Sequence, residues 1–178
     1  MSDRRLGIGV AGLGRAFMLT LPSFLADPRV RLVAATDPRA DATARFATEF
    51  GAHAHESIEG LCADPDVEVV YIATPHELHA KHVEIAAGHG KHVLVEKPMA
   101  IRQDECRAIV AAATRANVVV IVGPSHSFDR PIARAREIVA SGIYGGVRMI
   151  HAQYFTDFVY RVRRPQELDA KRGGRRSR

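Results

Sequence analysis

Continuous runs of Val and Ile, separated by helical patterns, constrain the fold of this chain more than any other feature. Val30–Thr36, Val67–Ala73 and Val118–Val122 are almost entirely apolar or β-branched, and they do not alternate with polar residues. Strands of this kind are buried on both faces, which is typical of parallel sheets. Helical patterns of about 10–15 residues separate the runs and predict right-handed crossovers. We therefore expect an α/β fold with a doubly wound parallel sheet.

The expected elements alternate along the first 122 residues. One irregularity is Pro22, which should kink the first helix or mark its start. The expected strands are Leu6–Val10, Val30–Thr36, Ala52–His55, Val67–Ala73, Val93–Glu96 and Val118–Val122. The expected helices are Gly14–Ala26, Ala40–Phe50, Ile58–Cys62, His76–Ala87 and Ile101–Ala116.

Gly123-Pro124 marks a change in organisation. Residues 1–123 form the expected sheet domain. Residues 124–160 then contain one helical pattern, Pro131–Ser141, and one loosely alternating run, Val147–Phe158, which we interpret as a long strand. These elements predict the start of a truncated second α/β domain. Residues 161–178 are polar, basic and glycine-containing, so we expect a disordered tail.

Charge and composition exclude several classes of protein. The net charge is +5, but residues 161–178 hold eight basic and two acidic residues, so residues 1–160 carry −1. The basic residues therefore belong to a tail rather than a groove, and we expect no nucleic-acid partner. No apolar run approaches the ~20 residues of a membrane span, so we expect no membrane partner. Cys62 and Cys106 have no disulfide or metal spacing, which favours reduced thiols in a cytoplasmic protein.

A glycine turn follows the first strand and opens the first helix. In Gly12-Leu13-Gly14-Arg15, Gly12 allows a tight turn, and Gly14 lets the backbone approach a pyrophosphate at the helix N-terminus. The third glycine of the usual pattern is replaced by Phe17, so the helix should sit differently on the strand. A turn that needs glycine only for its geometry, or a methyltransferase, would also fit this pattern.

Asp37 supports a dinucleotide. It ends the second strand, 23 residues after Gly14, where a carboxylate can accept hydrogen bonds from both hydroxyls of an adenosine ribose. Its charge repels a 2′-phosphate, so we expect NAD rather than NADP as the cofactor. Arg39 is close enough to soften that preference. The alternative is a purely structural residue before Pro38 at a helix start.

The run His92–Pro98 delivers Glu96 and Lys97 at the end of an apolar strand. Ligands bind at the carboxyl ends of strands in open α/β sheets. A lysine at this position can take or relay a proton, and a neighbouring glutamate can orient it or bind the cofactor. The alternative is a surface lysine with Glu96 as its solvated partner.

Three segments, Val10–Arg15, Ala73–His79 and Glu96–Pro98, together resemble the Gfo/Idh/MocA oxidoreductases. The resemblance covers about residues 5–160. It implies an N-terminal Rossmann domain that binds NAD and a C-terminal α/β domain with substrate residues and oligomer contacts. By this resemblance, Thr74, Pro75 and His79 lie beside the nicotinamide ribose, and Lys97 faces the nicotinamide and the substrate. The peptide before Pro98 is often cis in such proteins. The implied cofactor-binding residues are Gly12, Leu13, Gly14, Arg15, Asp37, Thr74, Pro75, His79, Glu96 and Lys97, with Lys97 and Glu96 catalytic.

A narrower resemblance concerns the substrate. Ser125–Asp129, Val147–Phe158 and Arg163–Asp169 look like the phthalate 4,5-dihydrodiol dehydrogenase branch. The implied reaction oxidises a small hydroxyl-bearing ring, such as a sugar, a polyol or an aromatic cis-dihydrodiol. Full-length family members are expected to be homo-oligomers of about twice this length, so we expect a truncated or frame-shifted chain, with a natural short protein as the alternative. A catalytically inactive NAD-binding fragment or a nucleotide-sensing regulatory module is the alternative.

The chain has nine histidines, which raises the question of a metal. His76, His79 and His82 recur on one expected helix, and His53 and His55 point to the same side of one strand. Ligation by such sets would need a cysteine or carboxylate nearby. We expect surface or cofactor-edge histidines and no metal ligand.

Overall fold

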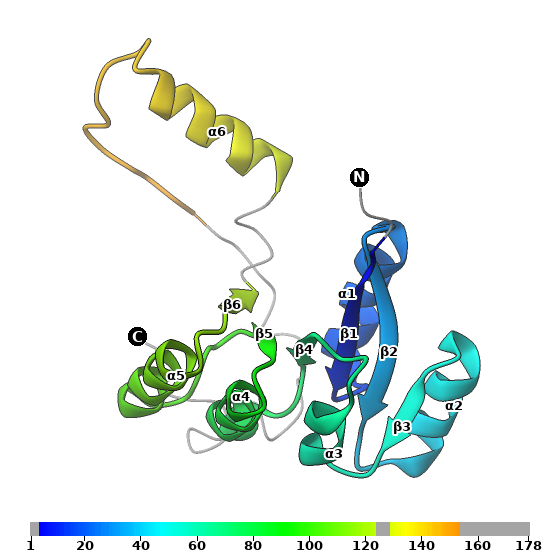
Figure 1. The fold of residues 1–178 in the computed structure, drawn as a ribbon. Coiled ribbons are helices and arrows are strands. Elements are labelled where there is room, and N and C mark those ends of the chain that lie inside the picture. The colour runs from blue at the N-terminus through cyan, green and yellow to red at the C-terminus, as the bar shows by residue number, and fades with distance from the viewer. Residues whose placement is uncertain (1–3, 124–128, 154–178) are drawn as a thin grey trace, which may run out of the picture.

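The structure is a computed structural model that describes residues 4–123 and 129–153. It contains a six-stranded parallel sheet with the order β3-β2-β1-β4-β5-β6 (Figure 1). This confirms the doubly wound α/β fold. The strands are β1 Leu6–Ala11, β2 Val30–Thr36, β3 His53–His55, β4 Val69–Ile72, β5 His92–Glu96 and β6 Val120–Gly123. The helices are α1 Arg15–Ala26, α2 Ala40–Phe50, α3 Ile58–Ala63, the 3₁₀ turn η1 His76–Leu78, α4 His79–Gly88, α5 Gln103–Ala116 and α6 Arg130–Ser141.

Two apolar clusters cover opposite faces of the sheet. On one face, α1 and α2 bring Phe17 and Phe46 against the strands, with Val10 and Tyr71 fully buried beneath them. On the other face, α3, α4 and α5 contribute the second cluster, which includes Leu61, Val83 and Ile109. Because successive side chains of a strand point to opposite faces, strands buried on both faces need the unbroken apolar runs seen in the sequence.

Some boundaries differ from the expected ones for local reasons. α5 begins at Gln103 instead of Ile101, because the Glu105 carboxylate accepts hydrogen bonds from the backbone N–H of Ile101 (3.2 Å) and Arg102 (3.0 Å) and caps the helix there. The expected helix from His76 divides into η1 and α4. α1 continues through Pro22 instead of starting there.

The region after β6 is different from the sheet domain. α6 has Asp129 at its N-cap, Pro131 in its first turn and Gly142 at its C-cap, with φ of +68°. All of its residues are exposed or half-exposed, and Figure 1 shows it apart from the sheet.

The long strand expected over Val147–Phe158 is wrong for the residues that the structure describes. Residues 147–153 have no regular secondary structure, and they are exposed. The physical reason is that a strand needs a neighbour to accept its hydrogen bonds, and no neighbouring strand pairs with this segment within the described ranges. Residues 154–158 and the expected disordered tail, 161–178, lie outside the described residues. Among residues 4–123 and 129–153, no helix is long and apolar enough to cross a membrane.

Candidate active site

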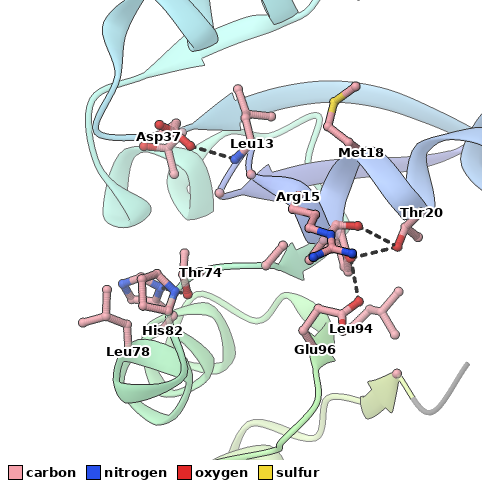
Figure 2. Close-up of a pocket in the computed structure, with 18 of the residues that line it drawn as sticks. Leu13, Arg15, Met18, Thr20, Asp37, Thr74, Leu78, His82, Leu94 and Glu96 are labelled. Atoms are coloured by element: carbon pink, nitrogen blue, oxygen red, sulfur yellow. Dashed lines mark hydrogen bonds between the residues drawn. The ribbon is translucent and has the colours of Figure 1, made fainter. Parts of the chain in front are cut away.

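The carboxyl ends of β1, β2, β4 and β5 meet at one edge of the sheet and form a groove. This groove measures about 1900 Å³, and Figure 2 shows a close-up of its lining. Because it is larger than a site for one small molecule, it has room for an extended ligand. The sequence-predicted residues that line it are Gly12, Leu13, Gly14, Arg15, Asp37, Thr74, Pro75, Glu96 and Lys97.

Gly12 shapes the turn between β1 and α1. Its φ is +95°, a backbone conformation that favours glycine. A Cβ atom at Gly12 would lie 2.8 Å from the carbonyl oxygen of Ala73. The close approach of the loop after β4 is therefore a second reason for a glycine at position 12. The Gly12 N–H donates to the carbonyl of Thr36 (2.9 Å), which connects the turn to the end of β2. Three strand ends are therefore held together at this point.

The N-terminus of α1 opens into the groove. Gly14 is its N-cap, no side chain caps the helix, and its first turn holds no acidic residue. A Cβ at Gly14 would meet no atom within 4 Å. Exposed N–H groups at a helix N-terminus favour an anion such as a pyrophosphate. Phe17, in place of a third glycine, is buried beside Phe46, with their ring centroids 5.8 Å apart.

Asp37 follows β2 and carries a buried carboxylate, only 7% exposed. Its Oδ2 accepts a hydrogen bond from the Leu13 N–H (2.8 Å), as Figure 2 shows, and its Oδ1 accepts from the Arg39 N–H (3.0 Å) and Nε (2.9 Å). Burial opposes ionisation, but the hydrogen bonds from Arg39 and Leu13 outweigh it, so the pKa of Asp37 is lowered.

Arg39 occupies the acceptor positions that a ribose would need. Besides its bonds to Oδ1, its Nη2 lies 3.2 Å from Oδ2 of Asp37 and 3.2 Å from the carbonyl of Leu13. The carboxylate then accepts four hydrogen bonds, which fills its lone-pair positions. Because the Arg39 side chain is 56% exposed, it can rotate into solvent. A ribose at Asp37 would have to displace it.

Glu96 is held in place by a buried tyrosine. The hydroxyl of Tyr71, in β4, donates to Glu96 Oε1 (2.8 Å) and lies 3.1 Å from the Thr20 hydroxyl in α1. Figure 2 labels Thr20 and Glu96, the two partners of this hydroxyl. Burial raises the pKa of Tyr71, and the contact with Glu96 raises it further, so this hydroxyl keeps its proton and acts as a donor.

Lys97 is exposed at the end of β5 and lines the groove. Within the part of the chain that the structure describes, Glu96 is bonded to Tyr71 and forms no ion pair with Lys97. The peptide between Lys97 and Pro98 is cis, as the resemblance implied. The Lys97 amine is therefore available to a ligand.

His79 does not line the groove, although the resemblance placed it beside a ribose. It is fully buried at the start of α4. Its Nδ1 lies 2.8 Å from the carbonyl of Pro98 and its Nε2 lies 3.0 Å from the carbonyl of Thr74. The ring thus connects two loops of the groove from behind. His82 lines the groove instead, and its Nδ1 lies 3.1 Å from the Thr74 hydroxyl.

Sequence reasoning missed Tyr71 and Thr20, and it named His82 only within a set of surface or cofactor-edge histidines. Only Tyr71 carried a usable signal, because a buried tyrosine hydroxyl generally needs a hydrogen-bond partner. Burial, followed by the nearby charges of His79 and Lys81, lowers the pKa of His82. A neutral His82 can exchange hydrogen bonds with Thr74 at the groove wall.

A scan against protein families matches residues 6–124 to Gfo/Idh/MocA, the oxidoreductase family with an NAD-binding Rossmann fold. The chain belongs to this family. It is 57% identical over 168 residues to 1-carboxy-3-chloro-3,4-dihydroxycyclohexa-1,5-diene dehydrogenase of Comamonas testosteroni. That alignment covers 94% of this chain and 42% of the relative. The family resemblance expected from the three sequence segments is confirmed.

Two solved structures support the family assignment. A protein from Bordetella bronchiseptica RB50, assigned as a dehydrogenase, matches with a TM-score of 0.90 and 38% identity over 96% of this chain and 45% of its own. GenD2 from gentamicin A biosynthesis, solved in complex with NAD, matches with a TM-score of 0.71 and 32% identity over 78% of this chain and 40% of its own. The chain thus spans less than half the length of these relatives.

Proposed function

We propose that this chain is the cofactor-binding part of an NAD-dependent dehydrogenase that oxidises a hydroxyl-bearing ring. The observation that carries the proposal is the position of Lys97, which lines the same groove as the glycine turn and Asp37. The groove fits a dinucleotide, since Gly14 leaves open space at the α1 N-terminus for a pyrophosphate and Asp37 offers a carboxylate to a ribose. When bound, NAD⁺ supplies the hydride acceptor.

In the proposed reaction, a substrate carbon loses a hydride while the hydroxyl on that carbon loses its proton. In its neutral form, Lys97 would take this proton at Nζ, because the residue lines the groove and has no competing partner in the described ranges. Glu96 is the second catalytic candidate. Its Oε1 is occupied by Tyr71, which leaves its other oxygen to orient Lys97 or to contact the cofactor.

The substrate class that we favour is a dihydroxylated cyclohexadiene carboxylate. Support comes from the Comamonas testosteroni relative, whose name describes such a compound and which is 57% identical to this chain. Sugars and polyols are the other candidates from the family resemblance. The partner would be a small molecule, and longer relatives would assemble as homo-oligomers. A cytoplasmic location and the absence of nucleic-acid and membrane partners stay predictions from the sequence.

NAD is the cofactor that we infer, in preference to NADP. The support is Asp37, which is ionised because its pKa is lowered and which would repel a 2′-phosphate. Arg39 acts in the opposite direction, since a guanidinium displaced from Asp37 could contact that phosphate. The balance between the two residues would decide the preference.

A second function, nucleotide binding without turnover, is favoured by one observation. The alignment with the Comamonas testosteroni relative covers 42% of that protein, so the likeness supports the nucleotide-binding part and does not extend to the rest of the relative. The alternatives are then an inactive fragment or a nucleotide-sensing module. They share the groove with the dehydrogenase and differ from it only in lacking activity.

Calorimetric titration with NAD⁺ and NADP⁺, followed by an NADH-formation assay with cyclohexadiene diols and sugars, separates these functions. The dehydrogenase predicts NAD⁺ binding and turnover of a cyclic diol. Binding of NAD⁺ without turnover of any substrate would favour the second function, and binding of neither nucleotide would reject both.

Variants sharpen this experiment. Lys97→Met should keep NAD⁺ binding and abolish turnover, because it removes the proton acceptor and leaves the glycine turn intact. Arg39→Ala should strengthen NAD⁺ binding and weaken NADP⁺ binding, because it removes the competitor for Asp37. The matched control is Arg45→Ala in α2, since Arg45 pairs with Asp41 on the surface (2.8 Å) and does not line the groove.

A further inference from the structure

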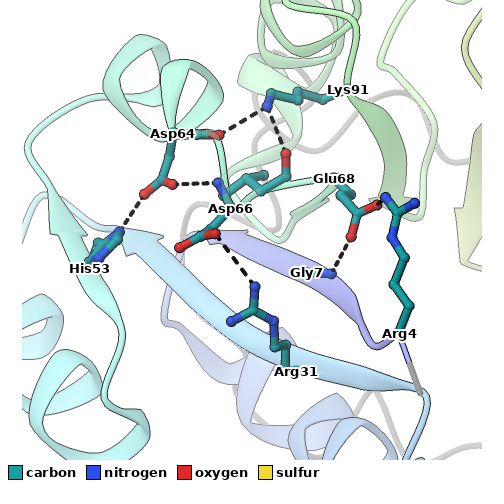
Figure 3. A network of polar contacts seen from close by, with 9 residues as sticks. Arg4, Gly7, Arg31, His53, Asp64, Asp66, Glu68 and Lys91 are labelled. Atoms are coloured by element: carbon teal, nitrogen blue, oxygen red, sulfur yellow. Dashed lines mark hydrogen bonds and ion pairs between the residues drawn. The ribbon is translucent and has the colours of Figure 1, made fainter. Parts of the chain in front are cut away.

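The two histidines of β3 share a carboxylate that the sequence did not reveal. His53 Nδ1 and His55 Nε2 each lie 2.8 Å from the same oxygen, Oδ2 of Asp64, which is the C-cap residue of α3. Figure 3 shows His53 facing Asp64. We expected no metal ligand, since ligation would need a cysteine or carboxylate beside the histidines. The fold brings one to them from the far end of the next helix.

We propose that His53, His55 and Asp64 form a binding site for a divalent transition-metal ion of the zinc type. The three ligand atoms all lie within 4.8 Å of one another. Two imidazole nitrogens and one carboxylate oxygen, with the fourth position left to water, are a ligand set that Zn²⁺ uses in proteins. The site lies apart from the groove, because none of the three residues lines it.

The geometry has to adjust before it can hold the ion. Metal–ligand bonds of about 2.0–2.1 Å in a tetrahedron place neighbouring ligand atoms about 3.3 Å apart, compared with 2.8 Å for each histidine–carboxylate contact here. Each imidazole nitrogen therefore has to move away from Oδ2 by about half an ångström. The two nitrogens, which lie within 4.8 Å of each other, have to reach the same spacing. The His53 side chain is 60% exposed and can move, whereas that of Asp64 is only 3% exposed and stays fixed.

Neighbouring groups hold the carboxylate in position. Asp64 Oδ1 accepts a hydrogen bond from the Asp66 N–H (2.9 Å), which leaves Oδ2 directed at the histidines. The Lys91 amine donates to the carbonyls of Asp64 (2.9 Å) and Val67 (2.7 Å), as Figure 3 shows, and so anchors the loop by its backbone. Such outer contacts orient metal ligands.

The chemistry of the cluster selects the kind of ion. Imidazole favours zinc, copper, nickel and iron, whereas magnesium and calcium prefer oxygen ligands. Cys62, two residues before Asp64, is fully buried and does not belong to the cluster, so the ligand atoms are two nitrogens and one oxygen. His53 and His55 also lie at right angles, with an angle of 88° between their rings, so their nitrogens approach Asp64 from different directions.

Zinc binding to the tag-free, chelator-treated full chain tests the proposal, by competition with a chromophoric chelator at about pH 7.5. We expect one Zn²⁺ per chain and, with Co²⁺ as a probe, the visible absorption bands of a four-coordinate site. His53→Ala, His55→Ala and Asp64→Asn should each weaken Zn²⁺ binding at least about tenfold, because even contacts outside the ligand shell have effects of this size. His151→Ala, which removes an exposed histidine elsewhere, is the matched control.

Two results would overturn the proposal. One is the absence of stoichiometric Zn²⁺ binding by the wild type. The other is an affinity for Zn²⁺ that does not depend on the cluster: either His53→Ala and His55→Ala bind Zn²⁺ as tightly as the wild type, or His151→Ala weakens Zn²⁺ binding as much as they do. Circular dichroism distinguishes a variant that has lost a metal ligand from one that has lost its fold. If Asp64→Asn unfolds, His53→Ala still tests the site, because the His53 side chain is largely exposed. NAD⁺ titration of the same variants separates failure of this site from failure of the groove.

Discussion

α5 and α6 are helices of similar amphipathic pattern, yet they lie in opposite environments. α5 buries Ile109 and Ala112 against the sheet, whereas α6 buries none of its residues. Both end in a left-handed C-cap residue, Asn117 and Gly142. The comparison teaches that caps and helix propensity are enough to specify a helix locally, but that burial depends on a complementary surface. Residues 4–123 contain that surface, and residues 129–153 do not.

The largest expected difference is in the free energy of unfolding, between two isoleucine-to-alanine variants. Ile109→Ala in α5 should lower the free energy of unfolding by about 2–5 kcal/mol, because Ile109 is fully buried and its loss leaves a cavity. Ile138→Ala in α6, where the residue is 38% exposed, should change it by less than about 0.5 kcal/mol. Urea unfolding of both variants measures the difference. Equal losses would mean that α6 packs in solution.

Two glycines provide the next comparison. Gly12→Ala should cost about 1–3 kcal/mol of stability and weaken NAD⁺ binding, because φ is +95° and the new Cβ would meet the Ala73 carbonyl at 2.8 Å. Gly145→Ala, with φ of +78° and no neighbouring atom within 4 Å, should leave NAD⁺ binding unchanged. Thermal unfolding and calorimetry measure the two effects. NAD⁺ affinity that survives Gly12→Ala would contradict the proposed role of the turn.

Two tyrosines test the hydrogen bond to Glu96. Tyr71→Phe removes the donor and should cost about 1 kcal/mol or slightly more, because the Glu96 carboxylate loses a buried partner. Tyr144→Phe changes a residue that is almost fully exposed and should have no measurable effect. Chemical denaturation reports the difference. If a substrate is found, Tyr71→Phe should also alter the pH profile of turnover, and an unchanged profile would limit Tyr71 to a structural role.

The smallest expected effect is the pH dependence of the stability that Asp37 contributes. Its pKa is lowered in the folded chain, so its contribution to stability is present above the unfolded value of about 3.9 and is lost as pH falls through the folded value. The stability difference between wild type and Asp37→Asn should therefore shrink below about pH 4. Glu137→Gln, which disrupts an exposed pair with Arg134 in α6, is the control and should show little change at any pH. A difference that grows in acid would refute the assignment.

Local patterns predicted most of the sheet domain, and long-range contacts account for what they missed. The Val and Ile runs located the strands, and Gly12, Asp37 and Lys97 were placed at strand ends that the fold brings to one groove. The contact of Tyr71 with Glu96 joins residues 25 positions apart. Arg39 lies only two positions from Asp37, and there the sequence indicated the proximity but not the hydrogen bonds. No periodicity encodes such contacts.

The error at Val147–Phe158 has a related cause. Its alternation of apolar and polar residues satisfies a strand pattern, but residues 147–153 find no neighbouring strand in the described ranges. Period-2 alternation reports which side chains could share a face, and hydrogen bonding from another chain segment decides whether a strand forms. The sequence pattern was also insufficient at His79, because it placed this residue on a helix without revealing that it is buried.

His79 has a mechanical consequence for the groove. One imidazole ring contacts the carbonyls of both Thr74 and Pro98. The loop after β4 and the loop after Lys97 are therefore connected through one side chain at the start of α4. The pairing of β4 with β5 and this one side chain therefore both hold the two loops at a fixed spacing, and the loops would shift together. A ligand that presses on one loop would be sensed at the other.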